Sequence, residues 1–225
     1  MVFQRAPSQP LVWGWGTPGS TITVTVLDSQ GSDVTIDAGQ AYVGDDEKFE
    51  VVIGSYEAGT GFSVNIRQFH QMSGQFLEVT LTDVAFGEVW VCSGQSNMEL
   101  RVKDARDGAK DVLAAEFYDQ LRLIKTVRQI ATEPQEEALG FYKRLLEDSW
   151  RKPMQEFLGS GESFSAICLY FGEQLWEDLQ VPIGLIESTW GGTIVEAWSP
   201  PRALDFCGVT DTGVDSGPNH NEYLW

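Results

Sequence analysis

Hydrophobic and polar residues alternate with a period of two along the early part of the chain, from about Leu11 to Val84. This is the spacing of side chains on one face of a β-strand. Turn-rich segments such as GTPGS and DSQGSD separate the alternating runs. The apolar members of the runs are Ile22, Val24, Val26, Phe49, Val51, Ile53, Val64, Ile66, Leu77, Val79 and Leu81. The pattern predicts a small all-β, sandwich-like domain over residues 1–85.

The period changes after Gly87. The segment EVWVC, residues 88–92, is apolar and β-branched and predicts a short buried strand. Residues 98–117 are rich in Ala, Leu, Glu, Lys and Arg, which favour a helix that Gly108 interrupts. The order strand, tight turn, helix indicates that residues 86–225 form an α/β domain.

A second strand and loop follow a predicted helix. Apolar positions three or four apart predict this helix; they are Phe164, Ile167, Cys168, Phe171, Leu175 and Leu179. The strand IGLIE, residues 183–187, then ends in the small-residue loop STWGGT. Loops at the carboxyl ends of strands form the ligand crevice of an open parallel sheet. We therefore expect this loop and the SGQSN turn, residues 93–97, to face one pocket.

Composition excludes several classes of partner. The 225 residues are 42% hydrophobic, enough to bury one large core or two modest ones. Lys and Arg total 15 against 33 Asp and Glu, and the formal net charge of −18 disfavours nucleic acid and anionic membranes. No run approaches the ~18 apolar residues of a membrane span. The opening MVFQRAPSQP also lacks the features of a signal peptide.

The cysteines and histidines do not predict a metal site. Cys92, Cys168 and Cys207 form no CxxC pair, and the chain has only two histidines. We expect neither a metal nor a cofactor. Cys92 and Cys168 lie in apolar surroundings and are interpreted as buried thiols, whereas Cys207, in a loop-like segment, could pair elsewhere.

Ser96 is the candidate nucleophile. A serine between a strand and a helix lies near unpaired backbone N–H groups, which favour an anion such as the oxyanion of an ester. Gly94 allows a tight turn, and Gly191 and Gly192 can bring backbone N–H groups close without a side chain in the way. The alternative is an ordinary turn with a helix cap, which the local pattern alone favours. The presence of two such loops, together with a family resemblance, shifts the balance towards chemistry.

SGQSNM after VWVC, followed by PIGLIESTWGGTIVEAWS, resembles the sialate O-acetylesterase family of SGNH-type hydrolases. The resemblance extends to MVFQR, VWGWGTPGSTITV, DVAFGEVW and FSAICLYFGEQL, and it weakens over residues 101–160 and 203–221. It implies an α/β/α catalytic domain with an appended β domain, and a serine esterase that removes O-acetyl groups from sialic acids through an acyl-enzyme. Ser96 matches the family nucleophile. The N–H groups of Ser96 and of Gly191 or Gly192 match the oxyanion donors.

The resemblance also implies catalytic residues that act with Ser96 and that this sequence does not show. The family's catalytic Asp and His and its oxyanion Asn lie in later blocks. His70 falls in the predicted β domain, and His220 precedes a segment unlike the catalytic one, so neither is a strong candidate base. The chain ends in an apolar cluster, residues 223–225, which suggests a cut through a domain. We therefore expect an N-terminal part of an esterase that is a poor catalyst alone, since losing a triad base can cost on the order of 10⁶ in rate.

Candidate substrate contacts lie beside the two loops. Gln95 adjoins the nucleophile, Trp190 could pack on a sugar face, and Arg202 could attract an anionic sialic acid. The alternatives are a core role for Trp190, and equally for Trp198, and a solvated surface role for Arg202. Glu187 and Glu196 could also be interpreted as the acid/base pair of a glycosidase. This interpretation is weak, because strand-end and helix-surface roles suit them.

Three functional classes remain open: a sialate O-acetylesterase, an acetylesterase for other polysaccharides such as xylan, and a non-catalytic binding or regulatory product. Downstream pocket residues would separate the first two, and the absent Asp and His favour the third. The expected ligand is an O-acetylated sialic acid or another acetylated carbohydrate. The resemblance implies a lysosomal or secreted location, and the sequence does not reveal an oligomeric state.

Overall fold

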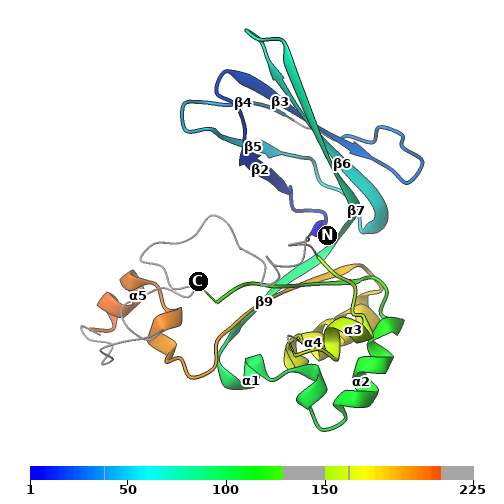
Figure 1. The fold of residues 1–225 in the computed structure, drawn as a ribbon, viewed down its shortest axis with the longest axis vertical. Coiled ribbons are helices and arrows are strands. Elements are labelled where there is room, and N and C mark those ends of the chain that lie inside the picture. Colours follow the sequence, from blue (N-terminus) through cyan, green and yellow to red (C-terminus); the bar gives the residue numbers. More distant parts are fainter. Residues whose placement is uncertain (38, 129–149, 162, 209–225) are drawn as a thin grey trace. The chain divides into compact units, whose positions relative to one another are not determined.

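The computed structural model describes residues 1–37, 39–128, 150–161 and 163–208 (Figure 1). The chain divides into two compact units. The first is Met1–Val89 with Val181–Ile183, and the second is Trp90–Gln180 with Gly184–Trp225. The α/β class predicted from the sequence is confirmed, because strands dominate the first unit and helices join strands in the second.

The first unit contains most of the strands. They are β1 (Val2–Gln4), β2 (Leu11–Trp15), β3 (Ser20–Leu27), β4 (Gln40–Tyr42), β5 (Lys48–Val52), β6 (Gly59–His70) and β7 (Gln75–Gly94). The larger sheet has the antiparallel order β4-β3-β6-β7, with β1 parallel to β7. The smaller sheet pairs β2 with β5 in antiparallel register.

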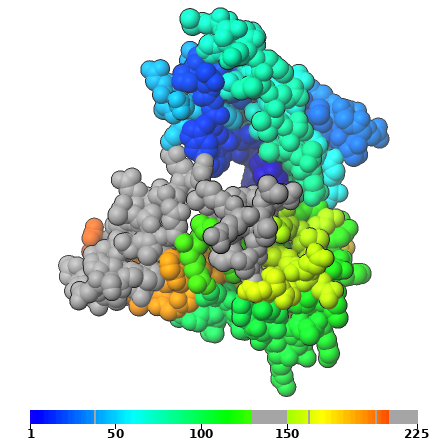
Figure 2. All heavy atoms as spheres, viewed as in Figure 1, coloured from blue at the N-terminus to red at the C-terminus, as the bar shows by residue number. Residues whose placement is uncertain are grey.

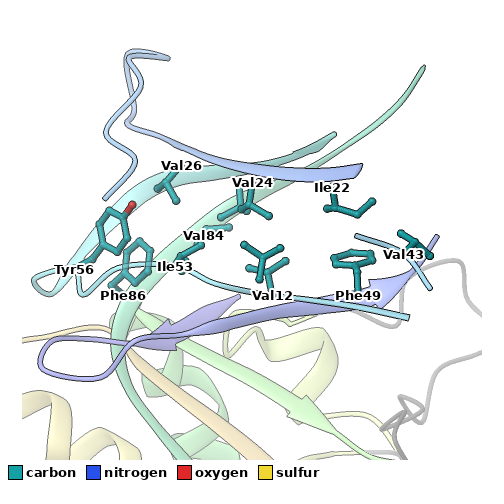
Figure 3. Close-up of a cluster of buried hydrophobic side chains, with 12 residues drawn as sticks. Val12, Ile22, Val24, Val26, Val43, Phe49, Ile53, Tyr56, Val84 and Phe86 are labelled. Atoms are coloured by element: carbon teal, nitrogen blue, oxygen red, sulfur yellow. The ribbon is translucent and has the colours of Figure 1, made fainter. Parts of the chain in front are cut away.

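The core of this unit lies between the two sheets (Figure 3). Every second residue of β3 is buried, as the period of two predicted. Its core residues Ile22, Val24 and Val26 face Val12 of β2 and Phe49 of β5 (Figure 3). Away from this core the β6–β7 hairpin stands at the surface (Figure 2). At its tip the side chain of Met72 is 94% exposed.

The long strand β7 differs from the expectation of two separate strands. Residues 77–81 and 88–92 belong to one continuous strand of 20 residues. It pairs with β6 as far as Phe86, where a residue of β7 still faces the core of the first unit. The same strand then continues to Gly94 and brings the chain to the second unit. The two hydrophobic runs form one strand, because no residue between them favours a turn strongly enough to end it.

In the second unit the strand order is β7-β9-β8. Its elements are α1 (Ser96–Glu99), α2 (Gly108–Ala114), β8 (Leu121–Lys125), α3 (Gln155–Leu158), α4 (Ala166–Leu179), β9 (Ile183–Thr189) and α5 (Pro201–Phe206). Short 3-10 turns lie at Val102–Asp104, Ala115–Phe117 and Val195–Trp198. No described helix is long and apolar enough to cross a membrane.

Two elements of this unit match the expected helix and strand, and one matches only in part. The predicted helix over 164–179 is confirmed as α4, whose N-cap Ser165 accepts a bond from the Cys168 N–H. The strand IGLIE is confirmed within β9. The helix expected over 98–117 is present only in part: α2 begins at Gly108, where an interruption was expected, and α1 and two 3-10 turns form the rest. The chain folds back tightly there: a Cβ on Gly108 would lie 2.2 Å from the Val102 carbonyl oxygen.

The interpretation of two cysteines as buried thiols is also wrong. Cys92 of β7 and Cys168 of α4 form a disulfide within the second unit. Their Cα atoms lie 5.9 Å apart although 76 residues separate them in sequence. Cys207 is a free, exposed cysteine. Among the described residues, no group of three or more His, Cys, Asp or Glu side chains is arranged to hold a metal ion.

Candidate active site

Ser96 begins α1, directly after the end of β7. The strand ends at Gly94, whose φ of +141° is rarely adopted by residues with a side chain. A Cβ at this position would also lie 3.1 Å from the Met98 Cγ. The turn therefore requires glycine, and it presents Ser96 as an exposed residue. The predicted order of strand, tight turn and helix is confirmed here.

Gln95, rather than a serine or an asparagine, caps α1. Its side-chain oxygen Oε1 accepts a bond from the Ser96 N–H at 3.0 Å. The same oxygen accepts the Ser96 hydroxyl at 2.5 Å. In the described part of the chain, the Ser96 hydroxyl thus donates to an amide oxygen and not to a base. The Gln95 side chain is exposed.

The loop after β9 lies beside the Ser96 turn. Two backbone hydrogen bonds, each 2.9 Å long, link the two ends of β9 to β7. The Glu88 N–H donates to the Pro182 oxygen just before β9, and the Trp190 N–H just after β9 donates to the Gly94 oxygen. Partners that advance together along both strands are typical of a parallel pair. Both strands therefore end at the same edge of the sheet, and the second bond brings the two loops side by side. That they line one pocket stays a prediction.

The two glycines of the second loop differ in their surroundings. The Gly191 N–H donates to the Glu99 carboxylate oxygen Oε2 at 2.5 Å. A Cβ on Gly191 would lie 3.8 Å from the Ser96 Cα. Gly192 is exposed, with a φ of +83° and open space where a Cβ would stand. The loop is closed by Thr193, which donates to the Trp190 carbonyl at 2.8 Å.

Two charged residues complete the contact between the loops. The Arg128 guanidinium forms an ion pair with Glu99 and lies over the Trp190 ring, 5.8 Å from its centroid. Sequence reasoning missed both Glu99 and Arg128. Glu99 lies three residues after Ser96, a spacing that places both on one helical turn and could have drawn attention to it. No local signal marks Arg128, which follows β8 and reaches the site through the fold alone.

Glu187 is buried inside the second unit. Its carboxylate pairs with the Lys125 ammonium at 2.9 Å and accepts the Ser165 N–H at 2.7 Å and the Thr189 hydroxyl at 2.6 Å. These bonds join β8, the start of α4 and the end of β9. Glu196, by contrast, lies on the partly exposed 3-10 turn after the loop. The bonds of the Glu187 carboxylate thus stabilise β9, the strand that precedes the second loop.

In the part of the chain that the structure describes, no hydrogen bond or ion pair joins the remaining candidate residues to Ser96. Arg202 is exposed on α5 and makes no hydrogen bond or ion pair among the described residues. The Trp198 ring N–H donates to the Thr193 hydroxyl at 2.8 Å, which supports the second loop. His70 Nδ1 lies 2.6 Å from the Ser73 hydroxyl in the first unit. His220 lies outside the described residues. No described histidine therefore bonds to Ser96.

The second unit also has an open hollow between α2 and α3. Its lining residues are Lys103, Ala109, Val112, Leu113, Gln155, Glu156, Gly159 and Ser160. None of them is a predicted site residue, so the chemistry assigned to the two loops does not depend on this hollow.

The chain is similar to known carbohydrate esterases. No protein-family model matches it. Human sialate O-acetylesterase is 37% identical over 232 residues, which cover 100% of this chain and 43% of the human protein. The rat sialate O-acetylesterase is 37% identical over 214 residues, or 94% of this chain and 38% of its own length. The chain thus spans less than half the length of these relatives.

A solved structure extends the similarity to the fold. It is a crystal structure described as a novel carbohydrate acetylesterase from Xanthomonas citri. The match has a TM-score of 0.73 and 28% sequence identity, and it covers 90% of this chain and 41% of that chain.

Proposed function

Since the chain is a homologue of the sialate O-acetylesterases along its full length, we propose that it supplies the nucleophile of a serine esterase that removes O-acetyl groups from sialic acids. The observation that carries the proposal is the contact between the Ser96 turn and the second glycine loop. The proposed division is an appended β domain over residues 1–85 and the N-terminal part of the catalytic α/β domain over residues 86–225.

In the proposed reaction, the Ser96 Oγ attacks the acetyl carbonyl while a base takes its proton. The carbonyl oxygen becomes an oxyanion, which the N–H groups of Ser96 and of Gly191 or Gly192 stabilise. The bond to the sugar oxygen then breaks, and that oxygen takes the proton back from the base. Water hydrolyses the acetyl-serine in the reverse sequence. Gln95 has to rotate first, because its amide oxygen occupies both the N–H and the hydroxyl of Ser96.

No described histidine bonds to the Ser96 hydroxyl, and we propose that the isolated chain is a poor catalyst. Removing the base of a serine hydrolase can reduce the rate by on the order of 10⁶. Turnover of an aryl acetate by this chain, abolished in Ser96→Ala, would contradict this expectation.

Three contacts are proposed for the substrate. Gln95 and Trp190 flank the nucleophile, and Arg202 would attract the carboxylate of a sialic acid. The partly exposed Trp190 ring already carries the Arg128 guanidinium over its face, so the site contains a cation close to the nucleophile turn. A lysosomal or secreted location is proposed with this function. The Cys92–Cys168 disulfide supports it, because disulfides persist in oxidising compartments.

A second candidate is an acetylesterase for other polysaccharides. The similarity to a structure described as a carbohydrate acetylesterase favours it. Release of acetate from O-acetylated sialic acid and from acetylated xylan, measured on the same active preparation, would separate the two substrates. A third candidate, a binding product without chemistry, predicts binding of acetylated sugar without acetate release.

The test is covalent labelling of Ser96 with an active-site serine phosphonate, read by mass spectrometry. Labelling that is lost in Ser96→Ala and kept in Ser93→Ala, a change at a neighbouring exposed serine, would support the proposal. Labelling only in a longer polypeptide that contains this chain would show that the base lies elsewhere. Failure of both preparations to label would contradict a nucleophilic Ser96.

A further inference from the structure

The short helix α1 carries two polar residues that reach different partners. Ser96 opens the helix and Glu99 closes it, so the two lie on one turn. The Glu99 side chain reaches the second loop and accepts the Gly191 N–H at 2.5 Å. A bond from a backbone N–H to a carboxylate is charge-assisted and about twice as strong as a neutral one. This bond ties the second loop directly to the turn that holds Ser96.

Arg128 holds the Glu99 carboxylate in place. Its guanidinium pairs with Glu99 and covers the Trp190 ring, so one cation contacts both loops. The Glu99 side chain is only 23% exposed, and its contacts are therefore partly shielded from solvent. The ion pair also neutralises the carboxylate. Without Arg128, a negative charge beside the nucleophile would disfavour a developing oxyanion.

The Glu99 carboxylate lies close to the backbone of residue 191. A Cβ there would lie 2.5 Å from the Glu99 oxygen Oε2. The φ of Gly191 is not positive, so its backbone does not require glycine. A side chain there would push the Glu99 carboxylate aside and so break its bond to the Gly191 N–H. The adjacent Gly192 has a φ of +83°, which favours glycine.

We propose that Glu99 is a positioning residue: it takes the N–H of Gly191 and thereby fixes the second loop at its working distance from Ser96. This inference rests on the proposed esterase function. In this role the Gly191 N–H serves to hold the loop and does not bind the oxyanion. Arg128 supports the arrangement by orienting and neutralising the Glu99 carboxylate.

The first test is independent of activity. In ¹⁵N NMR spectra of the 225-residue chain, the Gly191 amide should exchange slowly, and its shift should follow the titration of one carboxylate. Glu99→Gln keeps an oxygen acceptor, so exchange should stay slow while the pH-dependent shift disappears. Glu99→Ala should accelerate exchange of this amide about tenfold or more, as loss of a charge-assisted bond implies.

The matched control is Glu196→Ala. Glu196 lies shortly after the same loop, and its carboxylate makes no hydrogen bond or ion pair among the described residues. This variant should leave the Gly191 amide unchanged. Unchanged exchange in Glu99→Ala, or a Gly191 shift that ignores pH in the unmodified chain, would overturn the inference.

The second test uses a preparation that turns over an acetyl ester. Glu99→Ala should lower kcat about 100-fold and leave KM within about threefold, because a loop displaced by ~1 Å costs on this order. Glu99→Gln should recover most of that loss. A higher kcat in Glu99→Ala would overturn the inference and identify the carboxylate as a competitor of the oxyanion. If no preparation shows turnover, the proposed function fails, and the NMR test still decides whether Glu99 holds the loop.

Discussion

Cys92 and Cys168 are joined by a disulfide that connects the strand before Ser96 to the helix before the second loop. The two residues are 76 positions apart in sequence. The bond therefore links two chain segments that support opposite sides of the candidate site. In the unfolded state the same bond closes a long loop and so restricts the conformations of the chain.

Replacing both cysteines, Cys92→Ala with Cys168→Ala, should lower the free energy of unfolding by about 3–4 kcal/mol, because closing a long loop removes entropy from the unfolded state. Urea unfolding followed by circular dichroism measures this change, and a reducing agent should have a similar effect on the unmodified chain. Cys207→Ser is the control and should leave the urea midpoint unchanged, since Cys207 is free and exposed. Equal midpoints with and without reductant would contradict the prediction.

The Lys125–Glu187 ion pair gives a second prediction. Lys125→Met removes the cation and leaves the fully buried Glu187 carboxylate without its counter-charge. This should cost about 3 kcal/mol or more, as for other buried pairs that lose one partner. The same change at Lys110, whose side chain is 85% exposed, should alter stability by less than about 0.5 kcal/mol. Comparable urea midpoints for the two variants would show that the buried pair is not important for stability.

A third prediction concerns pH. Burial, together with the charges of Asp111 and Glu177, raises the pKa of Glu173 on α4 to about 7. The folded state thus binds this proton more tightly than the unfolded state, whose pKa is near 4.5. The associated stability is complete below about pH 4.5, falls as the pH rises towards 7, and then stays constant.

Glu173→Gln should therefore flatten this decline and stabilise the chain at pH 8. Solvent screening of a partly exposed carboxyl limits the gain to about 1 kcal/mol. Urea midpoints between pH 5 and pH 8 test it, with Glu156→Gln, a change at an exposed glutamate, as the control. Parallel pH profiles for Glu173→Gln and the unmodified chain would contradict the pKa shift.

The fourth prediction concerns the turn before the nucleophile. Gly94→Ala places a side chain at a φ of +141° and close to the Met98 Cγ. The strain should destabilise the chain by about 2 kcal/mol. It should also reduce phosphonate labelling of Ser96 in any preparation that labels. Gly161→Ala should change neither property, because a Cβ there meets open space. Unaltered unfolding and labelling in Gly94→Ala would show that the turn tolerates a side chain.

The elements predicted correctly are those whose signal is local. The strand around Val24 has an uninterrupted alternation, and its burial follows that alternation. The helix after Ser165 has a regular apolar stripe and a serine cap. The helix expected over 98–117 formed only in part, as α1, α2 and two 3-10 turns, and the close approach of Gly108 to Val102 accompanies the break between α2 and the turn before it. Composition reports propensity, and tertiary packing overrode it there.

In the candidate site, too, some features could be predicted from local sequence and others could not. The local pattern placed small-residue turns at Gly94 and after β9, and both turns are present. The nucleophilic role of Ser96 came from the pairing of the two loops and from the family resemblance, and it stays a prediction. The cysteine interpretation failed, because a disulfide depends on the distance between Cys92 and Cys168, which no local pattern records.

The sequence by itself thus determined most strands of the first unit, the strand IGLIE, the main helix and the turn that exposes Ser96, since these depend on neighbours within a few residues. Only the tertiary structure decided which side chains surround that turn. The contacts of Glu99 with Gly191 and Arg128, and of Lys125 with Glu187, join residues that are distant in sequence. They form because adjacent strands of one sheet bring separate segments of the chain to the same edge, where opposite charges and backbone donors meet.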